Sequence, residues 1–308
     1  MAYRLCTLYS GSKGNAAYLE TPTARILIDA GKNTRALAGA LGSIGVDVDT
    51  IDAIFITHEH TDHVAALEVL TKKHPIPVFM LYKSALRFRD TQPEALCACL
   101  QIREKAPFSE VIGNVTVTAF ETPHDSRASV GYRLEFPDRD RTVRIGYATD
   151  IGYITEEIRQ GVLGCEAVVL ESNHDVEMLM NGPYPYDLKL RIRGKRGHLS
   201  NRDCADFATE LAEQGTTHIL LAHLSEENNY PDLAYDETFA PLAGMNVTLR
   251  VASPCAVTML VGEASTPVPK GTLYHLEAEE NAYDAPDRPL HHRWKPEGTL
   301  PAGSRRRV

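Results

Sequence analysis

The sequence has no long hydrophobic segment and no paired-cysteine motif. None of its apolar runs reaches the roughly eighteen residues of a membrane-spanning helix. The first residues also lack a charged start, an apolar run and a small-residue cleavage site, so we expect no signal peptide. The six cysteines are scattered without a CxxC pair, which favours reduced thiols in a cytoplasmic protein. Cys97 and Cys99 form a lone CxC, which is a weak metal-binding signal.

The sequence has fewer basic residues than acidic ones, and this balance bears on whether the protein can bind nucleic acid. The net charge of −9 argues against a protein that coats nucleic acid with its whole surface. A protein that binds nucleic acid through a local basic patch remains compatible with this charge. The chain of 308 residues is 43% hydrophobic, which is enough for one large core or two small ones.

Strand-like segments alternate with helical ones over most of the chain. Strands are predicted at 3–9, 16–20, 25–29, 53–57, 78–82, 115–120, 129–136, 142–149, 167–172, 218–223 and 246–252. Helices are predicted near 34–42, from about 62 to 70, and near 155–160, 176–191, 201–214 and 233–242. Strands inside and helices outside, in two similar halves, predict an α/β protein with a four-layered αββα sandwich. We expect this domain to cover residues 1–262, and the remainder, 263–308, to be irregular or disordered.

The densest chemistry lies between a strand and a helix, in the run Thr57-His58-Glu59-His60-Thr61-Asp62-His63. In α/β proteins, such strand ends present ligands to a crevice. His58 and His60, two apart on an extended turn, can converge on one ion, while Asp62 and His63 face a second. Imidazole and carboxylate donors suit Zn²⁺, Mn²⁺ or Fe²⁺ without selecting among them. The alternative is a capping loop with surface histidines, in which Asp62 caps the helix.

This HxHxDH run resembles the signature of the metallo-β-lactamase superfamily. Three later segments at strand ends extend the resemblance: Thr122-Pro123-His124-Asp125, Ala148-Thr149-Asp150-Ile151-Gly152 and Leu221-Ala222-His223-Leu224. Taken singly, each such histidine is also compatible with a buried structural role. The resemblance implies two ligand sets, which are His58, His60 and His124 for one ion, and Asp62, His63 and His223 for the other. Asp150 would bridge the two ions.

One further acid belongs to the same resemblance. Asp29, in Ile28-Asp29-Ala30-Gly31, matches a family residue that supports the ligands by hydrogen bonding without touching the metal. The alternative is a turn-forming aspartate before a glycine.

Four more segments narrow the resemblance to the YycJ/WalJ group, which is bacterial and associated with exonuclease activity on DNA. They are Ser10-Gly11-Ser12-Lys13-Gly14-Asn15, Glu171-Ser172-Asn173-His174-Asp175, Gly197-His198-Leu199-Ser200-Asn201 and Leu224-Ser225-Glu226-Glu227-Asn228-Asn229. The resemblance covers residues 3–260. His198 resembles a histidine that contacts the scissile phosphate in related phosphodiesterases. The resemblance implies two catalytic residues. Asp62 would orient the nucleophile, and His198 would assist the leaving oxygen.

A basic run precedes His198, with Lys189, Arg191, Arg193, Lys195 and Arg196 before it and Arg202 after it. Such a run can neutralise backbone phosphates. An exposed helix face with solvated charges explains it equally well. The residues expected to contact substrate are Ser12, Asn15, His174, Lys195, Arg196, His198 and Asn201. For His174, a structural hydrogen bond is as good an interpretation.

Together these features predict a dinuclear metal-dependent phosphodiester hydrolase, and specifically an exonuclease that acts on DNA with a metal-bridged hydroxide as nucleophile. The two divalent ions would be Zn²⁺ or Mn²⁺, and Fe²⁺ is also compatible. One alternative is a small-molecule hydrolase, such as a cyclic phosphodiesterase or lactonase. The others are an RNA-processing nuclease on the same scaffold and a metal-binding regulator without turnover.

Overall fold

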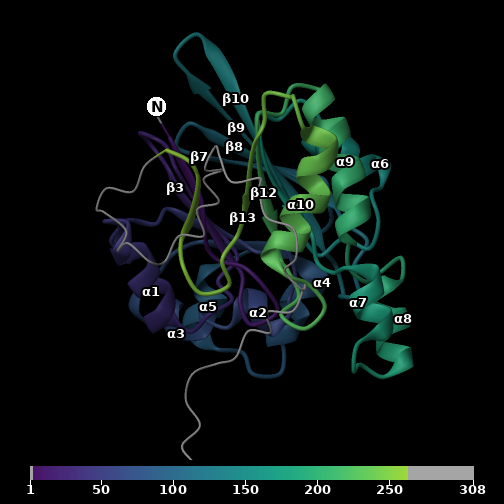
Figure 1. Ribbon diagram of the computed structural model, residues 1–308. Coiled ribbons are helices and arrows are strands. Elements are labelled where there is room, and N and C mark those ends of the chain that lie inside the picture. Colours follow the sequence, from purple (N-terminus) through teal and green to yellow (C-terminus); the bar gives the residue numbers. More distant parts are fainter. Residues whose placement is uncertain (1–2, 263–308) are drawn as a thin grey trace, which may run out of the picture. The chain divides into compact units, whose positions relative to one another are not determined.

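Two mixed β-sheets form the centre of the part that the computed structural model describes, residues 3–262 (Figure 1). The first sheet has seven strands, in the spatial order β14 (Thr258–Val261), β1 (Arg4–Tyr9), β2 (Ala16–Glu20), β3 (Arg25–Ile28), β4 (Ala53–Phe55), β5 (Val78–Leu81) and β6 (Leu100–Arg103). The second has seven, in the order β13 (Thr248–Val251), β12 (His218–Ala222), β11 (Ala167–Glu171), β10 (Arg141–Ala148), β9 (Val130–Asp138), β8 (Val115–Glu121) and β7 (Phe108–Ile112).

The helices follow the strands of each sheet along the chain. The first half contributes α1 (Thr34–Ser43), α2 (Thr61–Val64), α3 (Leu67–Lys73), α4 (Tyr82–Ala85) and α5 (Glu94–Cys99), with 3-10 turns at Val48–Thr50 and Leu86–Phe88. The second half contributes α6 (Glu156–Val162), α7 (Val176–Asn181), α8 (Tyr186–Arg193), α9 (Asn201–Glu213) and α10 (Pro231–Leu242).

Three hydrophobic clusters define four layers. The cluster between the sheets includes Phe55 of β4 and Tyr132 of β9. A second cluster joins the outer face of the first sheet to α1, α3 and α5, and a third joins the second sheet to α6, α9 and α10. The predicted αββα sandwich is therefore confirmed, and Figure 1 shows the two helical groups on opposite sides of the sheets.

Parallel strand pairs bring distant residues to one sheet edge. β3 pairs with β4, and β11 pairs with both β10 and β12, each in parallel. Asp29 and His223 directly follow β3 and β12, and Asp150 lies two residues after β10. Their φ angles are 64° (Asp29), 57° (His223) and 57° (Asp150). Non-glycine residues rarely adopt this left-handed conformation, and strain of this kind gathers at functional sites.

Two predicted helices are interrupted. The helix expected from Asp62 to Leu70 is divided into α2 and α3, because the amide of Ala66 donates to Ala30 O (2.9 Å) and Asp62 O instead accepts from Asn15 N (2.8 Å). The helix expected over 176–191 is divided into α7 and α8 by Gly182-Pro183-Tyr184-Pro185, since proline disfavours helical conformation in the residue before it.

Some elements were not predicted. β6, β7 and β14 lie at sheet edges, and their segments lack a clear alternation of apolar residues or are very short. The predicted irregular tail, 263–308, lies outside the described residues. Within the described range, the structure has no helix that is long and apolar enough to cross a membrane. All six cysteines are free.

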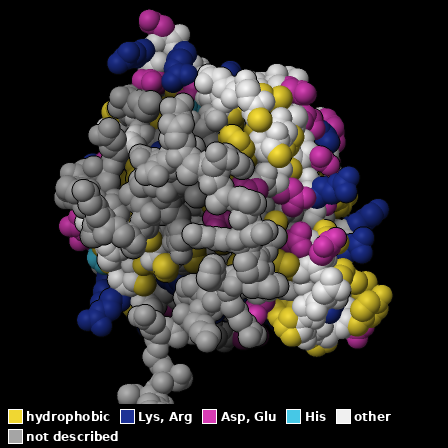
Figure 2. Space-filling model, viewed as in Figure 1, with side chains coloured by type: hydrophobic (Ala, Val, Ile, Leu, Met, Phe, Trp, Pro, Cys, Tyr) yellow, Lys and Arg dark blue, Asp and Glu magenta, His cyan; other side chains and the backbone are white. Residues whose placement is uncertain are grey.

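α8 stands out among the helices because it has no buried residue. Its Tyr186 and Leu190 are 65% and 47% exposed. Figure 2 shows hydrophobic side chains gathered in the region of α7 and α8. The basic run predicted from the sequence therefore begins on an exposed helix and continues into the loop before α9.

Candidate metal centre

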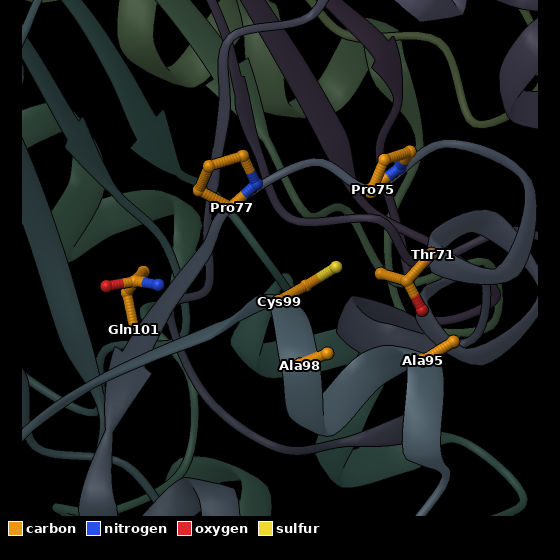
Figure 3. Close-up of a pocket in the computed structure, with 7 residues that line it drawn as sticks. All are labelled: Thr71, Pro75, Pro77, Ala95, Ala98, Cys99 and Gln101. Carbon is orange, nitrogen blue, oxygen red and sulfur yellow. The ribbon is translucent and has the colours of Figure 1, made fainter.

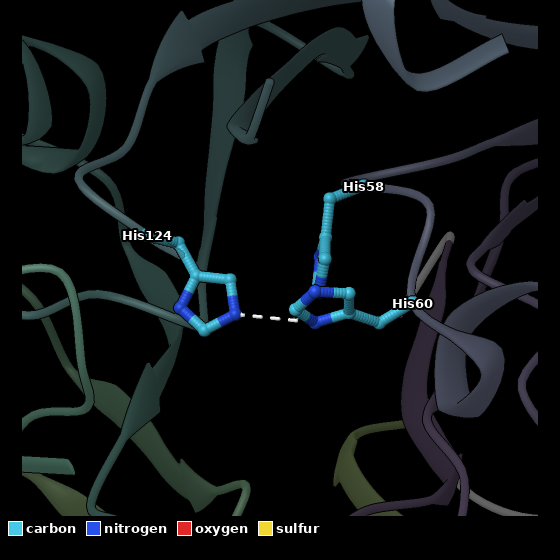
Figure 4. A group of neighbouring side chains, drawn as sticks. All are labelled: His58, His60 and His124. Atoms are coloured by element: carbon cyan, nitrogen blue, oxygen red, sulfur yellow. Dashed lines mark hydrogen bonds between the residues drawn. The ribbon is translucent and has the colours of Figure 1, made fainter. Parts of the chain in front are cut away.

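Three histidines from two loops form the first donor group. The ligand atoms of His58, His60 and His124 all lie within 4.8 Å of one another (Figure 4). His58 and His60 follow β4, whereas His124 follows β8 of the other sheet. The Nδ1 of His124 is 3.2 Å from Gly197 O, to which it donates, so its Nε2 faces His60 Nδ1 at 3.4 Å. The loop after β4 and the loop after β8 thus bring three imidazoles to one point.

Asp62, His63 and His223 form the second group, again with all ligand atoms within 4.8 Å. The Oδ2 of Asp62 lies 3.4 Å from His63 Nε2 and 3.8 Å from His223 Nε2. Behind His63, its Nδ1 donates to Asp29 Oδ2 at 2.8 Å, which fixes the tautomer that presents Nε2 to the group. Asp29 also accepts from the amide and hydroxyl of Thr57. Asp29 therefore hydrogen-bonds a candidate ligand, and its role in supporting a bound metal stays a prediction.

Asp150 lies between the two groups. Its Oδ2 is 3.4 Å from His63 Nε2, and its Oδ1 is 3.7 Å from His124 Nε2. The residue is only 1% exposed. Oδ1 also lies 3.5 Å from Nδ1 of His223. The carboxylate is therefore close to imidazoles of both groups, and its role as a bridging ligand stays a prediction.

The site buries ionisable carboxyl and imidazole groups, and each charged group is stabilised by neighbours of opposite charge. Burial alone would raise the pKa of Asp150, but the surrounding imidazoles, led by His223 and His63, hold its pKa well below the usual value. Burial likewise opposes charge on His223, yet Asp150, Asp62 and Glu171 raise the pKa of His223 to about 10. These carboxylates therefore attract positive charge into a buried space, whether it is carried by protons or by metal ions.

Divalent cations fit this donor set. His58 Nε2, Asp150 Oδ2 and His223 Nε2 are buried and have no hydrogen-bond partner among the described residues. Buried polar atoms of this kind are costly unless something satisfies them. Burial also lowers the pKa of His58 well below its usual value, so that its imidazole is neutral, as a metal ligand must be. Nitrogen and carboxylate donors suit Zn²⁺, Mn²⁺ or Fe²⁺.

Glu171, at the end of β11, is a site residue that the sequence analysis did not assign. It is fully buried, and its Oε1 accepts from Nδ1 of His198 and Nδ1 of His223, both at 2.8 Å. Its Oε2 accepts from the amides of Ile151 (2.8 Å) and Leu199 (3.2 Å). With four donors, the carboxylate has little capacity left for a metal, so it orients the two imidazoles. A lone glutamate that ends an otherwise apolar strand was the available signal.

His198 lies beside the donor groups. Its ring centroid is 5.0 Å from that of His124 and 5.1 Å from that of His223. Because Nδ1 donates to Glu171, Nε2 is the nitrogen left for a substrate, and it has no hydrogen bond within the described residues. The side chain is 22% exposed, unlike the buried His223. It is therefore an accessible imidazole at the edge of the centre.

Two residues predicted to contact substrate are instead enclosed. Asn15 is 1% exposed, and its side-chain amide nitrogen hydrogen-bonds to Gly11 O, Asp62 Oδ2 and His63 Nε2. Asn15 therefore holds the second donor group in place. Asn201 is fully buried, and its amide bonds Asn229 and Ser172. The amide of Asn201 is thus committed to neighbouring side chains, and its contact with a substrate stays a prediction.

The remaining predicted contacts differ in how free they are. Ser12 is exposed, and no described contact ties it to the histidines. Arg196 donates to the backbone oxygens of His124 (3.0 Å) and Ser126 (3.1 Å), so it braces the ligand loop. Lys195 is exposed, with its Nζ 5.9 Å from the ring of Tyr153. All three residues are exposed, and Arg196 is the one tied to the ligand loop.

One cavity lies away from this chemistry. It has a volume of about 290 Å³ and is lined by Thr71, Pro75, Pro77, Ala95, Ala98, Cys99 and Gln101 (Figure 3). No charged side chain is among these residues, and none belongs to either donor group. We assign no function to this cavity.

The αββα sandwich and its two donor groups define a class of protein, the metal-dependent hydrolases of the metallo-β-lactamase fold. The chain belongs to the β-lactamase superfamily, because residues 24–223 match the family described as "Beta-lactamase superfamily domain". Within it, the chain falls in the YycJ/WalJ-like group. The predicted resemblance is confirmed at both levels.

Two relatives carry this assignment. The chain is 33% identical over 238 residues to exodeoxyribonuclease YycJ of Bacillus anthracis, covering 76% of this chain and 87% of that protein. It is 32% identical over 270 residues to exodeoxyribonuclease WalJ of Streptococcus pneumoniae serotype 2, strain D39, covering 84% of this chain and 98% of that protein. Among solved structures, the metallo-β-lactamase fold protein YhfI of Bacillus subtilis has the same fold, with a TM-score of 0.61, 17% identity, and coverage of 83% of this chain and 98% of that one.

Proposed function

We propose that this chain is a two-metal phosphodiesterase that acts on DNA as an exonuclease. The observation that carries the proposal is Asp150, whose buried carboxylate lies between the two donor groups, within 4 Å of imidazoles of both, while His198 lies at their edge. Donor groups placed in this way would hold two ions, which would supply the chemistry of phosphodiester hydrolysis. The names of the two relatives, both exodeoxyribonucleases, support DNA as the polymer.

The roles of the ligands follow from their places. His58, His60 and His124 would hold one ion, Asp62, His63 and His223 the other, and Asp150 would bridge. We favour Zn²⁺ or Mn²⁺ and also consider Fe²⁺ compatible. When bound, two such ions lower the pKa of a shared water and polarise a phosphoryl oxygen. The free cysteines favour a cytoplasmic location.

Asp62 and His198 would act on the substrate side. Asp62 is 24% exposed at its side chain, so one of its oxygens can accept a hydrogen bond from the attacking water and orient it. His198 is aligned by Glu171 through Nδ1, so a protonated Nε2 can donate to the leaving oxygen. Lys195 and other exposed residues of the basic run would contact phosphates further along the strand.

A small-molecule hydrolase is the second candidate, and one observation favours it. Half of the basic run is committed within the protein, because Arg191 pairs with Asp125, Arg196 with backbone oxygens, and Lys189 with Met180 O. Fewer cations are then free for a long polyanion. The preferred and the second candidate differ in whether polymeric DNA is cleaved.

The experiment uses the full-length protein, stripped of metal and reloaded with Mn²⁺ or Zn²⁺. Labelled single-stranded DNA, double-stranded DNA, RNA and bis(p-nitrophenyl) phosphate are incubated with it, and products are separated by size. We expect mononucleotides released from a DNA end. Cleavage of only the small diester would transfer the assignment to the second candidate. No cleavage of any substrate would refute phosphodiester hydrolysis.

Substitutions separate chemistry from metal binding. We expect Asp62→Ala to lose nearly all turnover with the fold intact. We expect His198→Ala to lower kcat by about 10²- to 10⁴-fold while both ions are retained. His74→Ala is the control, because His74 follows α3, pairs with Asp49, and belongs to neither donor group. Metal analysis decides the role of His198, since a metal-depleted variant would make it a ligand.

A further inference from the structure

A second pocket adjoins the metal centre at His198. Its volume is about 520 Å³, within the range of small-molecule sites. His198 and Gly152, two residues after Asp150, form its boundary with the centre. Its other walls come from the starts of α7 and α9, the end of α8 and one residue of α10, and include Val176, Ser200 and Glu237. A group attached to a phosphate at His198 would therefore have this pocket next to it.

His174 is the unusual residue of this pocket. It is 1% exposed, yet neither ring nitrogen has a hydrogen-bond partner among the described residues. Burial lowers the pKa of His174 to about 4, so the ring is neutral and offers one donor and one acceptor. Its backbone is fixed, because it bridges to Ser200 and accepts from the amide of Asn201 at 2.9 Å. A polar ring held in place without partners in the wall of a pocket is suited to bind a ligand.

The charges of the pocket indicate what kind of ligand fits. Four carboxyl groups and two guanidinium groups line it: Asp175, Glu177, Asp203, Glu237, Arg193 and Arg202. Two of the carboxylates have structural roles, since Asp175 caps α7 and Asp203 accepts from Ser200. The excess of negative charge disfavours a second phosphate. An uncharged group rich in hydrogen-bond donors and acceptors suits it better.

We propose that this pocket holds the nucleoside joined to the scissile phosphate, with His174 hydrogen-bonding its base or sugar. The inference rests on the proposed phosphodiesterase function and deepens it. His174 is then a specificity residue, because a site built to hydrogen-bond a substrate rejects analogues that lack the partner group. The phosphate itself remains at the metal centre and the nucleoside is bound beside His198.

Two diesters with the same leaving group test the proposal. Thymidine 5′-(p-nitrophenyl phosphate) carries a nucleoside, whereas methyl p-nitrophenyl phosphate does not, and both release p-nitrophenolate. The metal-loaded protein should prefer the nucleoside diester by about tenfold or more in kcat/KM, chiefly through KM. Equal kcat/KM for the two diesters would overturn the pocket assignment while leaving phosphodiester hydrolysis intact.

Variants locate the preference. His174→Leu removes the hydrogen-bonding ring, and Val176→Trp fills the pocket from a half-buried position at the start of α7. Both should reduce the ratio of the two kcat/KM values toward one. The control is Val69→Trp, the same substitution on α3 at a residue that is 49% exposed. If Val176→Trp keeps the wild-type ratio, the nucleoside does not occupy this pocket.

A binding measurement covers the case in which neither diester is hydrolysed. Calorimetry with thymidine 5′-monophosphate and with methyl phosphate then compares the two ligands on the same full-length protein. Tighter binding of the nucleotide, lost in Val176→Trp and retained in Val69→Trp, supports the pocket even if the proposed reaction is wrong. Equal affinities for the two phosphates would refute it.

Discussion

At the scale of single residues, the centre depends on groups that hold ligands as much as on the ligands. Glu171 connects His198 and His223 through one oxygen and two loop amides through the other. A carboxylate in this position fixes the tautomer and the orientation of an imidazole. The proposed acid and one proposed ligand are thus aligned by the same buried side chain.

Glu171→Gln should therefore impair both imidazoles at once. The amide keeps the size of the side chain but loses the charge, and its NH₂ group would face donors that now bond an oxygen. We expect metal affinity or kcat to fall by about 10- to 100-fold. Competition with a chelator measures the affinity, and hydrolysis of a p-nitrophenyl diester measures kcat.

Glu121→Gln is the matched control for this change. Glu121 ends β8 in the same sheet, but its side chain is exposed. It should retain both values. Wild-type metal affinity and turnover in Glu171→Gln would mean that hydrogen bonding by Glu171 contributes nothing to the centre.

At the scale of elements, the short helix α2 is held by two loops, the one between β1 and β2 and the one after β3. Asn15 N donates to Asp62 O, and Ala30 N donates to His63 O, both at 2.8 Å. Gly31 lies so close that a Cβ there would stand 1.6 Å from Asp62 O. The second donor group is thus positioned by backbone contacts between segments about thirty to fifty residues apart in the sequence.

Gly31→Ala should displace α2 and with it Asp62. We expect a loss of about 1–3 kcal/mol in the free energy of unfolding, together with weaker metal binding, because backbone must move to admit the methyl group. Gly39→Ala is the control, since Gly39 lies in α1 with nothing within 4 Å of its added Cβ. It should stabilise the protein by about 0.5–1 kcal/mol. Urea titration and metal analysis measure both, and unchanged metal content in Gly31→Ala would count against the backbone contact.

These contacts also mark what the sequence could predict. The polar residues at strand ends could be recognised in the sequence, because each group follows an apolar run. Parallel pairing then brings these residues to one edge of the sheet. The enclosure of Asn15 and Asn201 could not be predicted, because burial of an amide depends on segments that meet only in the folded chain. Glu171 was missed for the same reason, since its four donors come from three separate segments.

At the scale of the whole molecule, a net charge of −9 must be reconciled with a polyanionic substrate. Unfavourable long-range repulsion is overcome only where cations gather locally. Arg193 and Lys195, at the end of α8 and in the loop after it, are exposed and close in sequence to His198. They are the members of the basic run best placed to contact DNA phosphates.

Charge reversal at these two positions should weaken DNA binding more than charge reversal elsewhere. We compare Arg193→Glu/Lys195→Glu with Lys72→Glu/Lys73→Glu, a pair of exposed lysines at the end of α3 that changes the net charge equally. The first double variant should bind single-stranded DNA more weakly, and the slope of log affinity against log salt should fall by about one for each lost phosphate contact. The second should keep the wild-type slope, because it changes the overall charge without removing a contact.

If both variants alter affinity equally at every salt concentration, only the net charge matters, and the loop before His198 does not bind the strand. Fluorescence anisotropy of a labelled oligonucleotide, between about 50 and 200 mM salt, distinguishes these outcomes.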